Sequence, residues 1–406
     1  MDGTLAPLLL LLLLFLPALL LYLRRRPAAN NHCPHPNPVL GNALPFLRNR
    51  HRFLDWATDL LAAAPTSTIE VRGALGLGSG VATANPAVVD HFLRASFPNY
   101  VKGARFALPF EDLLGRGLFA ADGRLWALQR KIASYSFSSR SLRRFSARVL
   151  RAHLHRRLEE GGELAAMFGS PGAKRRFLRD VVVSFVMAGK DSTSSALTWL
   201  FWLLAANPRC ERRVNEEVSS SRHADPRRAD AGEDGDGDGY DELRRMHYLH
   251  AAISEAMRLY PPVPIDSRVA VAADALPDGT AVRAGWFADY SAYAMGRMPQ
   301  LWGDGCREFR PERWLNDGGE FVAVDAARYP VFHAGPRACL GREMAYVQMK
   351  AVAAAVIRRF AVEPVQAPAS METPPACEVT TTLKMKGGLL VRIRKREDDA
   401  AQQKLT

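Results

Sequence analysis

Residues 332–341 read F-H-A-G-P-R-A-C-L-G, and a helical pattern follows at once over 342–360. Cys339 is therefore expected in a turn that leads into a helix N-terminus. The positive end of the helix dipole and the free backbone N–H groups there stabilise a thiolate. A lone cysteine is more often a small buried hydrophobic residue. The prediction of a functional cysteine therefore depends on the whole ten-residue pattern.

Two glycines and an arginine accompany the cysteine. Gly335 and Gly341 permit the backbone to approach a flat group closely. Arg337 offers a planar, two-pronged donor that suits a carboxylate. Together these residue types predict a site for a flat, carboxylate-bearing ligand next to a reactive sulfur.

The pattern F-x-x-G-x-R-x-C-x-G resembles the haem-binding signature of the cytochrome P450 family, the haem-thiolate monooxygenases. The resemblance implies that Cys339 is the axial ligand of the iron of haem b and that Arg337 pairs with a haem propionate. It also places Phe332, Gly335 and Gly341 in the haem-binding loop. A thiolate ligand pushes electron density toward the iron and favours O–O cleavage.

A charged pair on a helix lies further upstream. Glu255 and Arg258 form E-x-x-R, which puts both charges on one helical face, and such a pair alone is most often a weak surface ion pair. The block F-R-P-E-R-W follows at 309–314 and is similar to a family motif. The resemblance implies a network of Glu255, Arg258 and Arg313 that supports the core behind the haem and has a structural role.

Trp126 and Arg130 form W-x-x-x-R, four residues apart on one helical face. Alone, this spacing describes a half-buried tryptophan beside a solvated arginine. In the context of the cysteine signature it resembles the helix that donates to a haem propionate in cytochromes P450.

Residues 188–193, A-G-K-D-S-T, interrupt a long apolar helical pattern over 177–204. Such residues compete for backbone carbonyls and can kink a helix, or they form a harmless polar patch. The stretch resembles the family's oxygen-activation motif, which implies that Asp191 and Ser192 relay protons. The usual threonine is Ser192 here. Serine keeps the hydroxyl but loses the methyl group that fixes its rotamer, so we expect leakier coupling.

Composition limits the class of protein. The chain has 406 residues, of which 48% are hydrophobic and 24% charged, and a net charge of +12. These values exclude a disordered, collagenous or coiled-coil protein. The five cysteines are too few and too scattered for a disulfide scaffold and favour a reducing compartment. Nucleic-acid binding is disfavoured because the arginines are dispersed and no binding motif accompanies them.

The patterning predicts a mainly α fold with a minor β part. Strands do not alternate with helices, which disfavours a doubly wound fold. The Asp- and Gly-rich segment 225–239 is expected to be a surface loop, since Arg245 stands where a calcium loop would need its closing glutamate. Helical patterns occur over 51–63, 86–95, 122–160, 176–205, 208–221, 240–259 and 341–360, and β-like runs near 69–72, 267–271, 278–283 and 389–394.

The N-terminus predicts a membrane anchor. The run 5–23 holds 19 uncharged residues and is followed by three arginines. A helix of this length spans about 28 Å, close to the roughly 30 Å hydrocarbon core. The positive-inside rule leaves the following chain in the cytosol. A cleaved signal peptide is the alternative, but the charges follow the apolar run and no Ala-x-Ala site is present.

These features divide the chain into three parts. Residues 1–23 are expected to be a single-pass anchor in the endoplasmic reticulum membrane. Residues 24–50 are basic and proline-rich, and form either a plain linker or a hinge that orients the domain on the membrane lipid. Residues 51–406 are expected to be the cytosolic haem-thiolate monooxygenase domain.

Longer blocks at 178–199, 247–264, 293–298 and 341–350 indicate a branch of the family. They resemble the plant enzymes that hydroxylate the chain end of fatty acids and of jasmonoyl–amino acid conjugates. The resemblance implies O2 as co-substrate and electrons from NADPH through a separate flavoprotein reductase. It places the pocket-lining residues in 101–118, around Ala188, in 262–265 and in 382–385.

The chain departs from the family in its middle. Only 57 residues separate Arg130 from Ala188, an interval in which the family has several more helices, including the pair that roofs the substrate pocket. Since helices average about 11–12 residues, they cannot all fit. We therefore expect a cytochrome P450 fold that is truncated around 150–176. Uncovered apolar surface and a pocket open to water would follow.

Two further functions stay open on the sequence. The first is a haem-binding protein without catalytic activity, which the short middle segment favours. The second is a hydroperoxide isomerase or dehydratase that needs neither oxygen nor a reductase. Asp191 and Ser192 argue against the second, because such an enzyme does not need an acid–alcohol proton relay.

Overall fold

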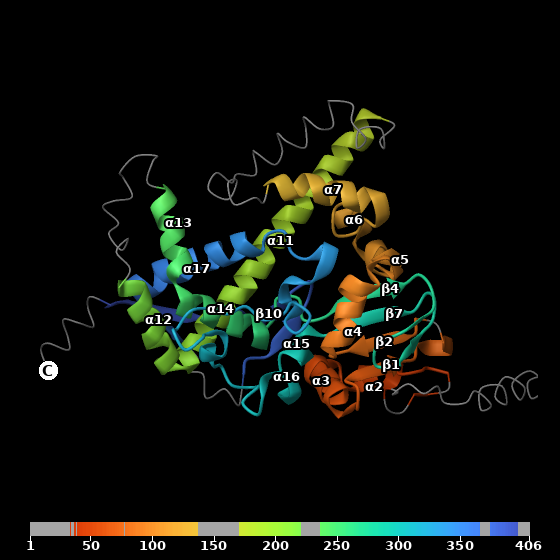
Figure 1. Ribbon diagram of the computed structural model, residues 1–406, viewed down its shortest axis with the longest axis horizontal. Coiled ribbons are helices and arrows are strands. Elements are labelled where there is room, and N and C mark those ends of the chain that lie inside the picture. The colour runs from red at the N-terminus through yellow and green to blue at the C-terminus, as the bar shows by residue number, and fades with distance from the viewer. Residues whose placement is uncertain are drawn as a thin grey trace, which may run out of the picture.

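The computed structural model of the chain consists of a helical part and a sheet part (Figure 1). It describes residues 33, 36–37, 39–76, 78–136, 170–220, 236–365 and 374–396. The expected membrane anchor at 1–23 and most of the shortened segment at 150–176 lie outside these residues. Within the described ranges, no helix is both long and apolar enough to cross a membrane.

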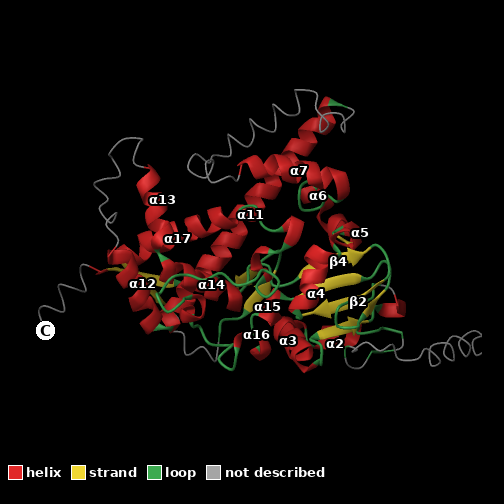
Figure 2. Ribbon diagram, viewed as in Figure 1, coloured by secondary structure: helices red, strands yellow, loops and turns green. Residues whose placement is uncertain are grey.

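Helices dominate the described chain (Figure 2), so the mainly α fold class is confirmed. The longer helices fall within or close to the expected helical patterns, whereas the short helices at 43–48, 103–107, 111–114, 292–295 and 299–302 were not expected. The α-helices are α2 (Ala43–Arg48), α3 (Phe53–Ala63), α4 (Pro86–Asp90), α5 (Gly103–Ala107), α6 (Glu111–Leu114), α7 (Gly123–Ser136), α11 (Pro171–Ala206), α12 (Pro208–Ser220), α13 (Asp236–Arg245), α14 (His247–Leu259), α15 (Ala292–Met295), α16 (Pro299–Trp302) and α17 (Arg342–Arg359).

Two segments are more ordered than the sequence suggests. The segment assigned to the hinge contains α2, and Cys33 is fully buried with its N–H donating to the Glu70 carbonyl (2.9 Å). The Asp- and Gly-rich segment was expected to be a loop up to residue 239, but α13 already begins at Asp236. Tertiary contact explains α13, because its Leu243 carbonyl accepts a hydrogen bond from Lys350 of α17 (2.7 Å).

A five-stranded sheet has the order β1 (Thr68–Val71), β2 (Gly80–Thr83), β7 (Phe287–Tyr290), β4 (Asp266–Ala270), β3 (Tyr100–Val101). Only the β2–β7 pair is parallel. The sequence missed β2 and β7, which are short and largely buried, so they show no alternation of polar residues. Smaller antiparallel pairs join β5 (Asp274–Ala275) to β6 (Ala281–Val282), β8 (Phe360–Pro364) to β11 (Val391–Lys395), and β9 (Cys377–Val379) to β10 (Leu383–Met385).

The register of β4 and β7 gives the sheet two chemically different faces. Asp266 pairs with Tyr290, and Ser267 pairs with Asp289. Because side chains alternate along a strand, Asp266, Arg268 and Tyr290 share one face. Ser267, Phe287 and Asp289 share the other face.

The long helix α11 is continuous. The sequence leaves open a kink or a harmless polar patch at 188–193, and the structure shows uninterrupted α-helix through these residues. The Ser192 hydroxyl donates to the Ala188 carbonyl, and Thr198 Oγ1 donates to the Ser194 carbonyl (2.8 Å). These hydroxyls therefore add hydrogen bonds within the helix and do not replace its backbone bonds.

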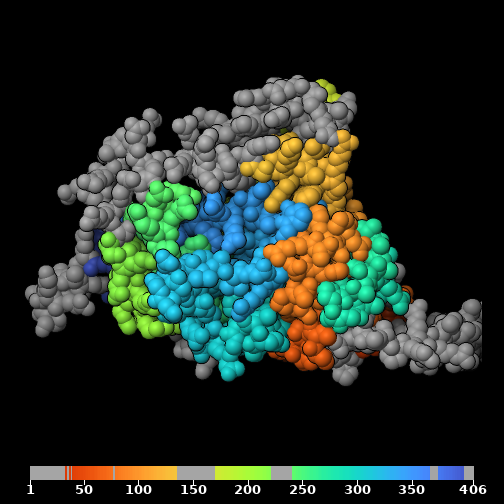
Figure 3. Space-filling view, viewed as in Figure 1, coloured from red at the N-terminus to blue at the C-terminus, as the bar shows by residue number. Residues whose placement is uncertain are grey.

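The helical core forms where the C-terminal half of α11 meets α14 and α17. Trp199 stacks on Tyr260 with ring centroids 3.8 Å apart, and both side chains are buried. The space-filling view shows the yellow-orange surface around α7 beside the blue surface of the C-terminal residues (Figure 3). Segments more than 200 residues apart thus meet, as when Arg130 of α7 donates to the Ala338 carbonyl.

A buried ionic network lies at the C-terminal end of α14. Glu255 and Arg258 form a two-pronged ion pair, with Arg258 Nε 2.7 Å from Glu255 Oε2 and both side chains fully buried. Arg313 Nε lies 3.0 Å from Glu255 Oε1, and Trp314 Nε1 donates to Oε2 (2.9 Å). Arg258 also donates to the carbonyls of residues 296, 306 and 308. The structure thus brings the three expected residues together and joins α14 to the loops that follow it.

Replacing Arg258 by methionine should strongly destabilise the protein. The change leaves Glu255 buried with one cation fewer, and breaking a buried ion pair costs about 3–5 kcal/mol. The free energy of unfolding of the full chain, from urea denaturation, measures the loss. Arg52→Met is the control, because the Arg52–Asp59 pair is exposed and such pairs contribute about 1 kcal/mol or less. Equal losses in the two variants would contradict this role of the network.

Candidate functional site

Cys339 lies in a loop that runs directly into α17. The loop is fixed from within, since the Cys339 N–H donates to the Phe332 carbonyl (2.8 Å). The side chain is exposed, yet the surrounding chain is close enough for desolvation to raise the pKa of its thiol. The backbone N–H of Gly341 and the charges of Arg130 and Arg342 act in the opposite direction. The net shift of the Cys339 pKa is upward, so these donors and cations offset only part of the desolvation.

The two glycines of the loop have different tasks. Gly335 has a positive φ of 64°, and a Cβ there would lie 1.9 Å from the Leu93 carbonyl oxygen. Gly335 therefore lies against the backbone of η3 (His91–Ala95), a π-helical turn. Gly341 has an ordinary φ of −88° and caps the N-terminus of α17.

Helix α7 is attached to the loop through its Trp126–Arg130 face. Arg130 donates to the Ala338 carbonyl, next to Cys339. The Arg337 guanidinium lies over the Trp126 ring, 4.5 Å from its centroid. The sequence-predicted residues of α7 and of the cysteine loop thus meet at one place.

Lys102 and Arg268 lie near this contact between α7 and the cysteine loop, and the sequence did not identify either residue. On β4, Asp266 accepts from Arg268 (2.6 Å) and from Lys102 Nζ (2.5 Å), and Tyr290 also donates to it (3.1 Å). The alternation of Asp266 and Arg268 was a usable signal, because it puts both on one face of the strand. No local sequence pattern identifies Lys102, which lies at the N-terminus of α5.

Arg337 completes the cluster. It pairs with Asp122 (2.6 Å), whose carboxylate also accepts the backbone N–H groups of Lys102 (3.1 Å) and Gly103 (2.9 Å). We refer to Lys102, Arg130, Arg268 and Arg337 with Asp122 and Asp266 as the cation cluster. Asp122 therefore ties the Arg337 side chain to the N-terminus of α5.

The cation cluster has a surplus of positive charge. Its four cations face two carboxylates. The neighbouring His333 adds no charge at pH 7, because burial lowers its pKa to about 4. Burial also lowers the pKa of Lys102 to about 8 and that of Arg337 to about 10. The surplus of two charges is what a ligand with two carboxylates would neutralise.

Unpaired donors in the cluster point to the same ligand. The Nε atoms of Arg268 and Arg337 are buried and have no hydrogen-bond partner within the described part of the chain. A buried donor without a partner is costly. The cluster therefore fits the two propionates of a haem, and Cys339 supplies a thiol at the adjacent helix start.

The residues expected to line a pocket come from four separate segments, of which 262–265 and 382–385 meet each other and contact α11 at Ser195 and Trp199, beyond the expected residues around Ala188. The Leu383 carbonyl accepts hydrogen bonds from Ser195 (2.5 Å) and Trp199 (3.2 Å) of α11, and the Leu383 N–H donates to the Pro262 carbonyl (2.9 Å). The fourth segment, at 101–118, reaches α11 further toward its N-terminus, where the Arg116 N–H donates to Asp180 (3.0 Å).

The proton-relay residues lie on a more open stretch of α11. Asp191 and Ser192 are partly exposed, and the three residues before them are exposed. Val186, one turn earlier, has 59% of its surface accessible. The face of α11 that carries the motif is therefore uncovered within the described chain.

Adding a methyl group at Gly335 should disrupt the cysteine loop. In Gly335→Ala the new Cβ meets the rigid Leu93 carbonyl, so we expect a loss of about 1–3 kcal/mol beyond the cost of the positive φ. The urea unfolding free energy measures it. Gly279→Ala is a matched control, because Gly279 also has a positive φ but no atom within 4 Å of the added Cβ. An equal effect at both glycines would contradict the steric explanation.

Comparison with known proteins agrees with this geometry. Residues 173–387 match the family model described as Cytochrome P450. The chain is 36% identical to cytochrome P450 CYP94D108 of Paris polyphylla over 467 aligned positions, which cover 88% of this chain and 91% of the relative. It is 33% identical to cytochrome P450 94A1 of Vicia sativa, over 90% and 91% of the two chains.

A third relative is cytochrome P450 94B1 of Arabidopsis thaliana, with 32% identity over 88% of this chain and 90% of that protein. All three names place these relatives in the same subdivision of the family. Membership implies a haem cofactor, a small-molecule substrate and a redox partner. The three relatives named here are members numbered 94, and the chain belongs to the cytochrome P450 family of monooxygenases.

Proposed function

We propose that the protein hydroxylates the terminal or near-terminal carbon of a fatty acid or of a fatty-acid-derived jasmonoyl–amino acid. It would use O2 and electrons that a separate flavoprotein reductase takes from NADPH. The N-terminal segment 1–23 would hold it in the endoplasmic reticulum membrane. The observation that carries the proposal is the cation cluster, because its surplus of two charges lies beside Cys339.

The residues of the cluster have separate tasks in holding haem b. Cys339 would be the axial ligand of the iron. Arg130, Arg268 and Arg337 would donate to the propionates, and Lys102 would hold Asp266 and add charge. When bound, the haem supplies the activation of O2, which a thiolate ligand favours.

Asp191 and Ser192 would move protons. The Ser192 hydroxyl now donates to the Ala188 carbonyl within α11, so it must rotate to hold a proton elsewhere. Serine rotates more freely than threonine, because it lacks the second heavy atom on Cβ. Asp191, the preceding residue, is partly exposed and can exchange a proton with solvent.

A second candidate function is haem binding without turnover. The alignment with the Paris polyphylla relative spans 467 positions, whereas the chain has 406 residues, so the relative has residues that this chain lacks. The uncovered face of α11 near Val186 agrees with a missing roof over the pocket. A pocket open to water weakens binding of an apolar chain and separates oxygen consumption from hydroxylation.

Turnover decides between the two candidates. The full chain in microsomes, with a plant reductase and NADPH, should convert dodecanoic acid into hydroxylated products near the chain end, identified by mass spectrometry. Control reactions without NADPH should give no hydroxylated product. NADPH consumption that yields hydrogen peroxide but no hydroxylated acid would favour the second candidate.

A threonine at position 192 should tighten the coupling. In Ser192→Thr, the share of electrons lost as hydrogen peroxide should fall by about twofold, since fixing a side-chain rotamer is worth about 0.5 kcal/mol. The ratio of hydrogen peroxide formed to NADPH consumed measures this. Ser194→Thr, two residues along the same helix, serves as the control. An unchanged ratio in Ser192→Thr would contradict the proposed role of Ser192.

A further inference from the structure

His333 lies in the cysteine loop in a backbone conformation that side chains rarely adopt. Its φ of 57° and ψ of −174° fall in a region that is occupied almost only by glycine. It directly follows η9 (Pro330–Phe332), and its N–H donates to the Pro330 carbonyl (3.0 Å). Strained positions of this kind cluster at ligand-binding sites. Glycine would remove the strain here, but it would also remove the imidazole.

The imidazole competes with Asp266 for the hydroxyl proton of Tyr290. The Tyr290 oxygen lies 2.5 Å from His333 Nδ1 and 3.1 Å from Asp266 Oδ2. A hydroxyl carries one proton, so it donates to only one of these two acceptors at a time. Asp266 does not depend on this proton, because Lys102 (2.5 Å) and Arg268 (2.6 Å) also donate to its carboxylate.

The direction of the Tyr290 proton decides which nitrogen of His333 is protonated. The ring is neutral at pH 7, since burial lowers its pKa to about 4, and a neutral imidazole has one N–H. When Tyr290 donates to Asp266, the proton of His333 lies on Nδ1 and its Nε2 is an acceptor. When Tyr290 donates to Nδ1, the proton of His333 lies on Nε2, which then becomes a donor.

The ring of His333 is surrounded by the charges of the cation cluster. Asp266 and three of the cations, Lys102, Arg130 and Arg268, all act on its protonation. Of the His333 side chain, 26% is exposed, and Nε2 has no hydrogen-bond partner within the described chain. A carboxylate that neutralises these cations would therefore lie within reach of a nitrogen that has no partner yet.

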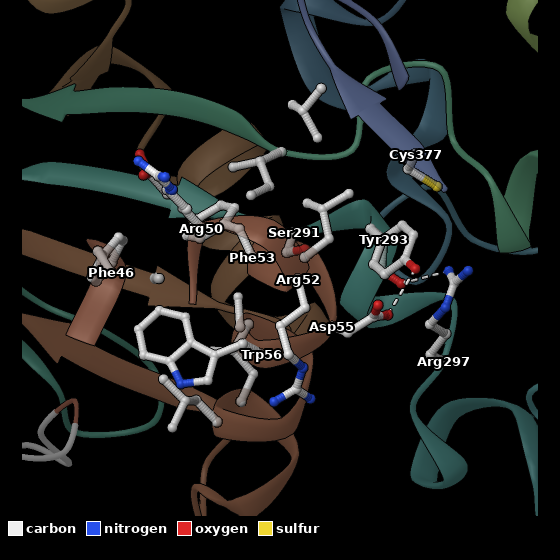
Figure 4. Close-up of a pocket in the computed structure, with 18 of the residues that line it drawn as sticks. Phe46, Arg50, Arg52, Phe53, Asp55, Trp56, Ser291, Tyr293, Arg297 and Cys377 are labelled. Atoms are coloured by element: carbon white, nitrogen blue, oxygen red, sulfur yellow. Dashed lines mark hydrogen bonds between the residues drawn. The ribbon is translucent and has the colours of Figure 1, made fainter. Parts of the chain in front are cut away.

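A large groove elsewhere in the protein does not account for the exposed part of His333. The groove has a volume of about 1930 Å³ and runs past Trp56 of α3 and Tyr293 of α15 (Figure 4). Asp289 lines it, on the face of the sheet opposite to that of Asp266. His333 and Asp266 are not among the described residues that line this groove. The exposed part of His333 thus belongs to the side that carries the cation cluster.

We propose that His333 donates a hydrogen bond from Nε2 to a propionate of haem b, and that the Tyr290 hydroxyl then turns from Asp266 to His333 Nδ1. Protons balance, because Nδ1 gives up one proton to solvent and Nε2 takes one from it, while Tyr290 keeps its own. A neutral donor suits this place, since the surplus of two charges already matches two carboxylates. The inference rests on the haem binding that the proposed function requires.

The rate of haem loss tests this role. The purified full chain, loaded with haem, releases it to an excess of apomyoglobin, and the change in absorbance gives the rate. In His333→Phe, which keeps a ring but has no nitrogen, the rate should rise about tenfold, as expected for the loss of one hydrogen bond to a charged group. For haem dimethyl ester, whose propionates carry no charge, it should change by less than about twofold.

His333→Gly separates a binding role from a structural one. Glycine relieves the backbone strain, so a residue with only a structural task should bind haem as firmly or more firmly after this change. We expect faster haem loss instead, by about tenfold, because the donor is gone. A rate at or below that of the wild type would overturn the proposal, as would an equal rise for haem and its dimethyl ester in His333→Phe.

Tyr290→Phe tests the shared proton. Without the hydroxyl, Nε2 is no longer fixed as a donor, and haem loss should accelerate about threefold, at the lower end of the coupling between contacting residues. In the double variant with His333→Phe, the rate should stay within about twofold of that of His333→Phe alone. Independent effects of the two substitutions would contradict the role of Tyr290.

This proposal and the proposed function can fail separately, because haem loss is measured without turnover. Haem loss that depends on His333, in a protein that forms no hydroxylated acid, would leave the role of His333 standing and count against the monooxygenase function. Hydroxylated product together with unchanged haem loss in both His333 variants would overturn the role of His333 alone. A full chain that takes up no haem would overturn both.

Discussion

The surplus of buried positive charge beside Cys339 is the constraint on which the rest of the structure depends. Lys102, Arg130, Arg268 and Arg337 come from four separate elements, and two carboxylates leave half of their charge unbalanced. Burying like charges together is unfavourable unless an anion joins them. The fold tolerates this arrangement because Asp122, Asp266 and the backbone carbonyl of Ala338 hold the cations in place. An anionic cofactor would turn the same arrangement from a cost into a stabilising contribution.

The sequence predicts most of what depends on fixed spacing. The cysteine loop, the Trp126–Arg130 face and the Glu255–Arg258 pair are local patterns. The structure places the cysteine before a helix and the two pairs on helices, as predicted. Lys102 and Arg268 could not be assigned in this way, because their partners belong to other segments and their roles appear only when α5 and β4 are brought together. Strands β2 and β7 were missed for a related reason, since short strands covered on both faces lose the alternation that identifies them.

Gly335 and α11 show what the structure adds to residue type. Gly335 leaves room for the Leu93 carbonyl, a contact that the local sequence could not reveal. In α11, hydroxyls bond to carbonyls one turn earlier and the helix stays continuous, which agrees with a polar patch, one of the two alternatives that the sequence left open. In both cases the structure identifies the carbonyl group that the residue approaches.

The two faces of the central sheet carry chemically different side chains. One face carries Asp266 and Arg268, which would help to hold the cofactor, and the other carries Ser267, Phe287 and Asp289. In the described chain, the face of α11 around Val186 is exposed.

The most direct test is the carbon-monoxide difference spectrum of the reduced full chain in membranes. We expect the Soret band of thiolate-ligated haem, and its loss in Cys339→Ser with retention of the protein. It would be contradicted by the absence of any haem band, or by only the band of the form whose sulfur is not a thiolate. Either result would mean that the charges gathered beside Cys339 do not suffice to hold a functional haem.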